Sequence, residues 1–156
     1  MTKMQGALLV SFFALFFYQW GATNLEGLLN YPFWRDMGRV MANNDFIQLR
    51  ANHVAKIFPL VVIPFFLALA VTISLVFAAP AFIPRWQLLV VAGLHTAIAL
   101  STILLQIPIQ AQLSRTGYDA AAFDRLIMTD VVLRKIPAAG EAVFVLLILW
   151  RVVMRV

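Results

Sequence analysis

Polar side chains recur at helical spacing near the ends of long apolar stretches of this sequence. Gln19, Thr23, Glu26 and Asn30 follow one another at intervals of four, three and four residues, which places them in one stripe along a helix. Such groups are costly below a lipid surface, so by default they line a cavity, pair with one another or serve chemistry. The stripe is therefore a candidate wall of a polar site.

Three further groups of polar residues repeat this pattern along the chain. They are His53 with Lys56, His95 with Thr102, Gln106 and Gln110, and Asp130 with Arg134 and Glu141. Together these groups contain the residue types that general acid–base chemistry needs. The candidate catalytic residues are His53, Arg134, Glu26 and Glu141, and the candidate ligand-binding residues are Gln19, Gln106, Gln110, Asp130 and Tyr31.

Each candidate catalytic residue has a chemical role that fits its type. His53 would act as a general base, and Arg134 would stabilise a developing oxyanion. Glu26 and Glu141 would orient these two side chains. We expect Glu141 to be ionised and paired with a basic group, first of all Arg134, or else His53 or the neighbouring Lys56, because a nearby cation favours a charged carboxylate.

A purely structural interpretation of the same residues stands beside the chemical one. Asp130 and Arg134 are four residues apart, the spacing of an ordinary ion pair on a helix. His95 lies inside an apolar stretch, where a histidine commonly hydrogen-bonds between membrane helices. On this interpretation the polar residues only hold the helices together.

No metal site, cofactor or nucleotide-binding motif is predicted. A nitrogen-and-oxygen metal site from His53, His95, Glu26, Asp130 and Glu141 is an alternative, but no histidine has a second ligand three or four residues away. The chain has no cysteine, which excludes disulfides and thiolate chemistry. It also lacks the GxSxG motif, a phosphate-binding glycine loop and the dinucleotide fingerprint.

The composition is that of a membrane protein. Hydrophobic residues make up 63% of the chain and charged residues 12%, against roughly 45–50% and 25% in soluble domains. The net charge of +5 comes from basic residues that flank apolar runs, where they meet lipid head groups. The predicted partner is therefore the lipid bilayer and not a nucleic acid.

Four apolar segments are long enough to cross the hydrocarbon core of a bilayer, which takes about 20 helical residues. They lie approximately at residues 4–25, 57–79, 86–109 and 136–154. The fourth contains Glu141, and its Arg151 can reach the head groups. The chain, residues 1–156, is predicted to be a single all-α domain, an integral membrane four-helix bundle.

The connections between these segments are alternately long, short and long. Both long connections and the polar ends of the helices therefore lie on one side of the membrane, and both termini lie on the other. The side of the long connections carries eight basic residues against four on the terminal side, a count that favours long connections inside. Those eight are offset by acidic residues, whereas the four on the terminal side, Lys3, Arg85, Arg151 and Arg155, have no acidic neighbour, which favours cytoplasmic termini. We expect the protein in a bacterial cytoplasmic membrane.

The long connections contain signals for further helices. The run Asn43-Asn44-Asp45 and, in the second connection, Asp119 are candidate N-caps. Tyr31-Pro32 is expected to stop the first helix, and Pro137 to mark the start or a kink of the last. We expect each long connection to lie on the membrane surface as an amphipathic, helix-rich cover.

Short motifs run in order through nearly the whole chain. They are Asn30-Tyr31-Pro32-Phe33-Trp34, then Phe46 and His53 ahead of Val62-Ile63-Pro64, then Gln106-Ile107-Pro108-Ile109-Gln110, then Gly117-Tyr118-Asp119 and Arg125-Leu126-Ile127-Met128-Thr129-Asp130. In this order they resemble the anthrone-oxygenase-like family of small four-helix membrane proteins. The resemblance implies a four-span bundle and, for the members with known activity, cofactor-independent oxidation of a polycyclic phenolic substrate.

The sequence departs from that family's pattern at four positions. Gln110 stands where a histidine is common, and Asp130 stands where asparagine is common. Val131 replaces a tryptophan, and Arg134 falls one place late. A shared metal or base role is therefore not carried over to Gln110.

Two classes of function follow from these residues. The first is the binding or conversion of a lipophilic small molecule, such as a quinone, polyketide or isoprenoid, in a polar-lined pocket on the side of the long connections. The alternative is a non-catalytic accessory or structural subunit of a larger membrane complex, whose partner subunits would cover the apolar flanks. An oligomer is compatible with both, and a transporter ranks third because four spans without a repeat need oligomerisation to enclose a path.

Overall fold

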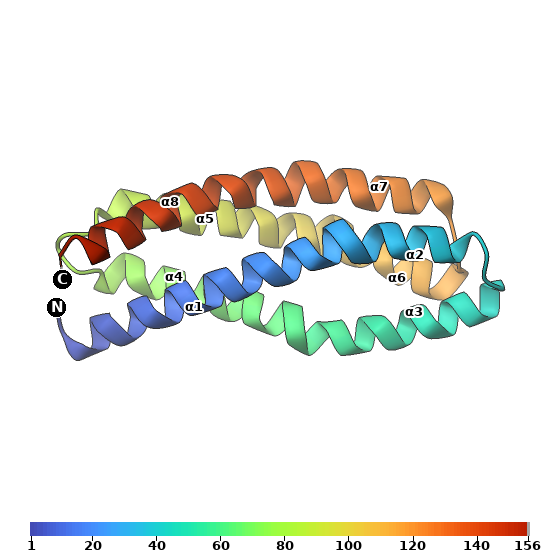
Figure 1. Ribbon diagram of the computed structural model, residues 1–156, viewed down its shortest axis with the longest axis horizontal. Helices are drawn as coiled ribbons and strands as arrows, with labels where there is room; N and C mark the ends of the chain where they lie inside the picture. Colours follow the sequence, from blue (N-terminus) through green and yellow to red (C-terminus); the bar gives the residue numbers. More distant parts are fainter. Residues whose placement is uncertain (156) are drawn as a thin grey trace.

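The computed structural model describes residues 1–155, which form four long antiparallel helical rods (Figure 1). The rods cover Lys3–Gly38, Asn43–Ala78, Arg85–Thr116 and Ala120–Val153. Each is long and apolar enough to cross a membrane, and no strand occurs within the described residues. The predicted all-α four-helix bundle of membrane type is confirmed, and each expected span coincides with part of one rod, the second and fourth ending one residue beyond it.

Each rod consists of two α-helices joined by a π-helical turn. In chain order the elements are α1 (Lys3–Leu25), η1 (Glu26–Asn30), α2 (Tyr31–Gly38), α3 (Asn43–Ile57), η2 (Phe58–Val62), α4 (Ile63–Ala78), α5 (Arg85–Ser101), η3 (Thr102–Gln106), α6 (Ile107–Thr116), α7 (Ala120–Asp130), η4 (Val131–Lys135) and α8 (Ile136–Val153).

A proline follows each π turn, and the wider turn explains why the helix continues through the proline. Pro32, Pro64, Pro108 and Pro137 are each the second residue of the next α-helix. Proline lacks an N–H and clashes with the carbonyl four residues earlier, whereas the residue before it bonds the carbonyl five residues back, as the Tyr31 amide does to Glu26. The expectation that Tyr31-Pro32 stops the first helix is therefore wrong.

The long connections do not lie flat on a membrane surface. A rod of 36 residues is about 54 Å long at 1.5 Å per residue, well beyond the roughly 30 Å of hydrocarbon. The extensions α2, α3, α6 and α7 continue the rods as a second bundle, with a core that includes Tyr31, Trp34, Phe46 and Phe123. The extensions bury their aromatic faces against one another, so the expected amphipathic cover on the membrane surface does not form. Figure 1 confirms that both inter-rod loops of this half lie opposite the two termini.

The loops of this far end are fixed by side chains. Asp119 caps α7 as expected, since its Oδ1 accepts the Ala122 amide at 3.2 Å. Asn43 begins α3 but makes no capping bond. It reaches the other loop instead and accepts the Tyr118 amide at 3.0 Å. Gly117 has a φ of 93°, and a side chain there would collide with Asn43, so glycine is required.

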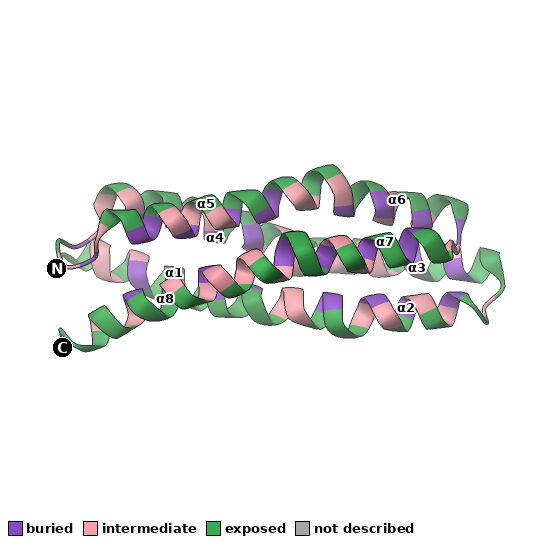
Figure 2. Cartoon of the chain, turned by 90° about the horizontal axis from the view of Figure 1, so that it is seen from above, coloured by how far each residue is buried: buried purple, intermediate pink, exposed green. Residues whose placement is uncertain are grey.

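The core has two apolar ends with a polar layer between them. Leu9, Phe12, Phe16 and Val145 belong to the cluster near the termini, and the aromatic cluster of the far half closes the other end. Figure 2 shows the buried faces turned inward along every rod. Neighbouring α1 and α4, α4 and α5, and α5 and α8 pack extensively, whereas α1 and α8 touch little. In the half that carries the termini, the seam between α1 and α8 is thus the most loosely packed.

Candidate functional site

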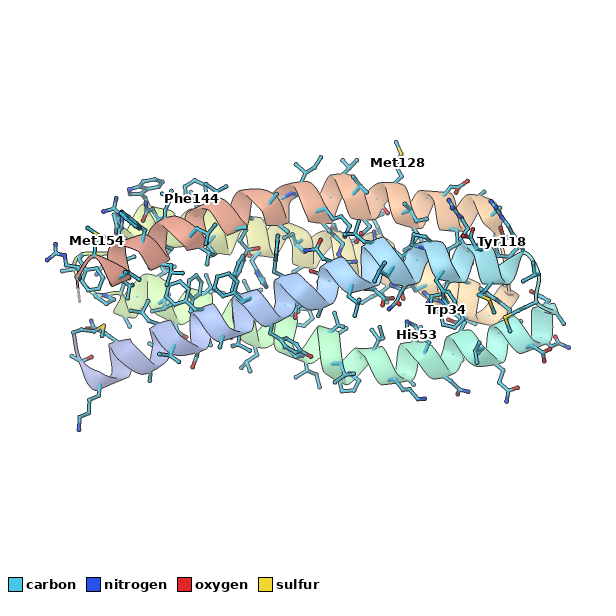
Figure 3. The ribbon with its side chains drawn as sticks, in the orientation of Figure 1. Trp34, His53, Tyr118, Met128, Phe144 and Met154 are labelled. Atoms are coloured by element: carbon cyan, nitrogen blue, oxygen red, sulfur yellow. The ribbon has the colours of Figure 1, made fainter. Side chains whose placement is uncertain are left out.

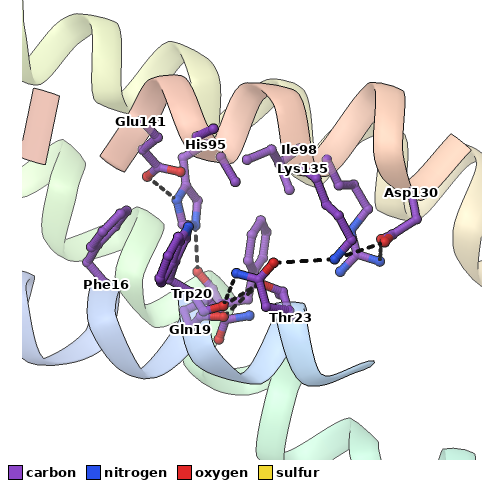
Figure 4. Close-up of a pocket in the computed structure, with 14 residues that line it drawn as sticks. Phe16, Gln19, Trp20, Thr23, His95, Ile98, Asp130, Lys135 and Glu141 are labelled. Atoms are coloured by element: carbon purple, nitrogen blue, oxygen red, sulfur yellow. Dashed lines mark hydrogen bonds and ion pairs between the residues drawn. The ribbon is translucent and has the colours of Figure 1, made fainter. Parts of the chain in front are cut away.

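A cavity of about 140 Å³ lies between the first rod and the fourth, at the level of the polar layer (Figure 4). Gln19, Trp20 and Thr23 line it from α1. His95 from α5 and Glu141 from α8 form one end of the cavity. The other end carries charged residues of the fourth rod, Asp130, Arg134 and Lys135.

His95 and Glu141 form a buried pair at the inner end of the cavity. Their side chains are 3% and 4% exposed, and Nδ1 of His95 lies 2.8 Å from Oε1 of Glu141. The other ring nitrogen, Nε2, lies 3.2 Å from the Phe65 carbonyl oxygen. The Phe65 ring stacks on the imidazole with centroids 4.3 Å apart. The imidazole is therefore held by two hydrogen bonds and one ring face.

The geometry of this pair fixes its charge. The Phe65 carbonyl can only accept, so Nε2 of His95 carries a hydrogen. A hydrogen bond between Nδ1 and the carboxyl group of Glu141 requires one more proton. With this proton on the nitrogen the two groups form an ion pair, and with it on the carboxyl they form a neutral pair. In both arrangements the pair has no net charge. It shares a proton at the wall of a cavity.

Gln19 brings an unused amide to the same cavity. Gln19 is 4% exposed, yet neither Oε1 nor Nε2 of its side chain has a hydrogen-bond partner among residues 1–155. A buried polar group without a partner costs about 1–3 kcal/mol, and such groups are rare in native proteins. Gln19 thus offers the N–H donors of Nε2 and the acceptor Oε1 to whatever occupies the cavity.

The charged end of the cavity is held in place by close packing on the first rod. Nη1 of Arg134 lies 2.9 Å from one Asp130 oxygen, and Nζ of Lys135 lies 3.4 Å from the other. Lys135 also donates to Asn24 Oδ1 at 3.4 Å. A side chain at Gly27 would collide with both Asp130 and Lys135. The glycine therefore lets this ion pair approach the backbone of η1.

A second network extends from Arg134 toward the far half of the bundle. The Tyr31 hydroxyl oxygen accepts from Arg134 at 3.2 Å and from Gln110 Nε2 at 3.0 Å. Arg50, which is 0% exposed, donates to Gln110 Oε1 at 3.1 Å and lies over the Trp34 ring at 5.4 Å. Apart from Arg134, the residues of this network lie outside the cavity lining, and the network connects all four rods.

Glu26 and His53 form a third polar group, between the first and second rods. His53 Nε2 lies 3.5 Å from Glu26 Oε1, and Asn30 donates to Oε2 at 2.6 Å. Figure 3 shows His53 beside Trp34 in the half away from the termini, with ring centroids 5.0 Å apart. Glu26 and Asn30 also line a groove of about 470 Å³ between α1 and the second rod. The expected contact of Glu26 with His53 is present.

The structure separates the residues that the sequence placed in one site. Those that line the cavity between the first and fourth rods are Gln19, Asp130, Arg134 and Glu141. Those that lie elsewhere in the polar layer are Glu26, His53, Gln106, Gln110 and Tyr31. Gln106 bonds the Thr129 hydroxyl at 2.8 Å. Within residues 1–155 no three His, Cys, Asp or Glu side chains gather as a metal site would require.

The expected partner of Glu141 is wrong. The carboxylate contacts His95 and not Arg134, Lys56 or His53. Glu141 follows Arg134 by seven residues, about 10 Å along a helix axis, so the two groups occupy opposite ends of the cavity. The proposed assembly of His53, Arg134 and Glu141 around one reacting centre does not form.

Several residues of the site were not singled out as site residues from the sequence. His95, which was interpreted as a structural histidine between helices, lines the cavity together with Trp20, Asn24 and Lys135. Gly27 makes room for the charged end of the cavity. Lys135 adjoins Arg134, and side chains of successive helical residues normally diverge. The π turn η4 alters this register, so both cations reach one cavity. The proline after each turn is the sequence signal that could have revealed it.

The chain was compared with protein-family models, with curated proteins and with solved structures, and none of the three comparisons finds a match.

Proposed function

We propose that this chain is an integral membrane protein that binds a lipophilic small molecule, with the polar head group in the cavity between α1 and α8. One observation carries the proposal. Gln19 is buried, and both of its amide atoms lack a hydrogen-bond partner within residues 1–155. It lines the same cavity as the pair of His95 and Glu141. A head group with a hydroxyl or carbonyl would satisfy the amide that the protein leaves open.

The size of the cavity limits what enters it. A volume of about 140 Å³ is close to that of an engineered cavity of roughly 150 Å³ that binds benzene. A head group of about one ring therefore fits, and the rest of the molecule leaves along the loosely packed seam past Trp20, which is 45% exposed. The family resemblance implies a polycyclic substrate, and one ring of such a substrate would lie inside the cavity.

The cavity also has the groups for proton transfer. The proton shared by His95 and Glu141 can move to a bound oxygen atom, and the same pair can take a proton back. Arg134 and Lys135 stabilise negative charge that develops at the opposite end. Conversion of the ligand by a proton shift is thus the reaction class that this cavity supports.

An accessory role in a membrane complex is the second candidate. Phe33 and Met128 are 53% and 68% exposed in the half where the rods extend past one hydrocarbon thickness. Exposed apolar side chains in such a place fit a partner subunit. The membrane that we propose is a bacterial cytoplasmic membrane, and the basic residues of the terminal end favour termini on its inner side.

Purification in a mild detergent followed by extraction and mass spectrometry tests the binding proposal. The wild-type chain should retain a lipophilic molecule in near-stoichiometric amount. Gln19→Leu should lose it, while Gln48→Leu, at an exposed position without hydrogen bonds, should keep it. A stoichiometric protein partner together with no retained molecule in either sample would favour the accessory role.

A further inference from the structure

The charged end of the cavity holds more positive than negative charge. Arg134 and Lys135 both contact Asp130, so two cations share a single carboxylate. Their side chains are only 9% and 19% exposed, and that of Asp130 is 2% exposed. One positive charge therefore remains uncompensated in a nearly enclosed place.

The neighbouring ionisable groups do not cancel this charge. The pair of His95 and Glu141 is neutral as a unit, because it shares one proton. By formal charge count, Glu26 is offset within the polar layer by the buried Arg50, although the two side chains are not paired, and protonation of His53 would only add positive charge. The layer as a whole keeps a charge of plus one.

The two cations also have hydrogen-bond donors to spare. Nε of Arg134 is buried and has no partner within residues 1–155. Lys135 has three ammonium hydrogens, and two of its polar neighbours are Asp130 and Asn24. Both side chains line the cavity. A buried charge without a partner is strongly destabilising, whereas a well-bonded counter-ion relieves that cost.

We propose that the natural ligand of this cavity is a lipophilic acid bound as its monoanion, with a carboxylate between Lys135 and Arg134. This inference rests on the proposed function and names the ligand class. A carboxylate has two acceptor oxygens, one for each free donor, and charge-assisted bonds of this kind are about twice as strong as neutral ones. A second polar group on the ligand would reach Gln19, and the apolar part follows the seam between α1 and α8.

Quenching of tryptophan fluorescence tests this inference, because Trp20 lines the cavity. The full chain in nanodiscs of zwitterionic lipid is titrated with a brominated dodecanoic acid and with its methyl ester. The signal lost in Trp20→Phe identifies contact at the cavity. The acid should quench this signal with an apparent affinity about tenfold or more above that of the ester, the size of effect expected for one charge-assisted contact.

Variants of Lys135 decide the outcome. Lys135→Gln should lower the apparent affinity for the acid to that for the ester, whereas Lys135→Arg should preserve the preference for the acid. The exposed control Lys56→Gln should behave as wild type. Equal quenching by acid and ester would overturn the charge inference and leave the proposed cavity intact. Quenching by neither compound beyond the Trp20→Phe background, together with no retained molecule in the extraction experiment, would reject both.

Discussion

His95 and Glu141 are joined by a hydrogen bond of 2.8 Å between Nδ1 and Oε1, although 46 residues separate them in the chain. The bond connects α5 to α8 in the middle of the bundle. It lies at the inner end of a cavity that also exposes the free amide of Gln19. The same contact therefore links the stability of the bundle to the chemistry of the cavity.

Replacing one member of this pair should cost more than replacing both. Glu141→Leu leaves Nδ1 of His95 buried without a partner, and we expect a loss of about 1–3 kcal/mol. The double variant His95→Leu with Glu141→Leu removes both polar groups and should lose less than the sum of the single variants, with a coupling of about 0.5–3 kcal/mol. Reversible unfolding in detergent measures all four proteins. Strict additivity would mean that the pair does not form.

Gln19→Leu should make the ligand-free protein more stable. The substitution removes a buried amide that has no partner and keeps a similar volume, so a gain of about 1 kcal/mol is expected. The same variant should lose the bound lipophile. Thermal unfolding of the delipidated protein provides the measurement, with Gln48→Leu as the exposed control. A clear loss of stability would show that Gln19 has a structural partner and is not reserved for a ligand.

Gly27→Ala and Gly21→Ala should act in opposite directions. Alanine in place of glycine usually stabilises a helix by up to about 1 kcal/mol, and Gly21 has open space around it. At Gly27 the new methyl group collides with Asp130 and Lys135, so the ion pair must move and stability should fall. Melting temperatures of the two variants, compared side by side, check this. A gain in both would place Asp130 and Lys135 away from the first rod.

Cysteine labelling should divide the chain into two sides of the membrane. Single cysteines at Thr2 and Ala81 should react alike with an impermeant reagent in intact cells, because the first end of the bundle carries both termini and the α4–α5 turn (Figure 1). Cysteines at Asn44 and Thr116 should share the opposite behaviour. Labelling of Thr2 together with Asn44 from outside would contradict the four-span arrangement.

The sequence was sufficient to predict four apolar spans and the end at which the long connections lie, but not the extension of the spans into longer rods. Hydropathy is a local property, and each span shows it independently of its neighbours. The contact between Glu26 and His53 was also within reach, since both residues lie at corresponding depths of consecutive helices. Asp119 was identified as a cap because its side chain acts on an amide three residues away.

The partners within the cavity could not be predicted in the same way. The pairing of Glu141 with His95 depends on which helix faces meet, and no local pattern determines this. The π turns change further which side chains lie on one face of a rod. The turn η4 places Lys135 and Arg134 at the same cavity, and the turn η1 lets the first rod continue from α1 through Pro32 into α2. A rule that treats proline as a helix stop fails where a wider turn absorbs it.

An experimental structure of the full chain in lipid nanodiscs, purified with whatever it retains, tests the central claim most directly. We predict density for a lipophilic molecule between α1 and α8, with a polar atom within hydrogen-bond distance of the Gln19 amide and of the pair formed by His95 and Glu141. An empty seam in which α1 closes onto α8, with Gln19 bonded to a neighbouring side chain, would contradict the account.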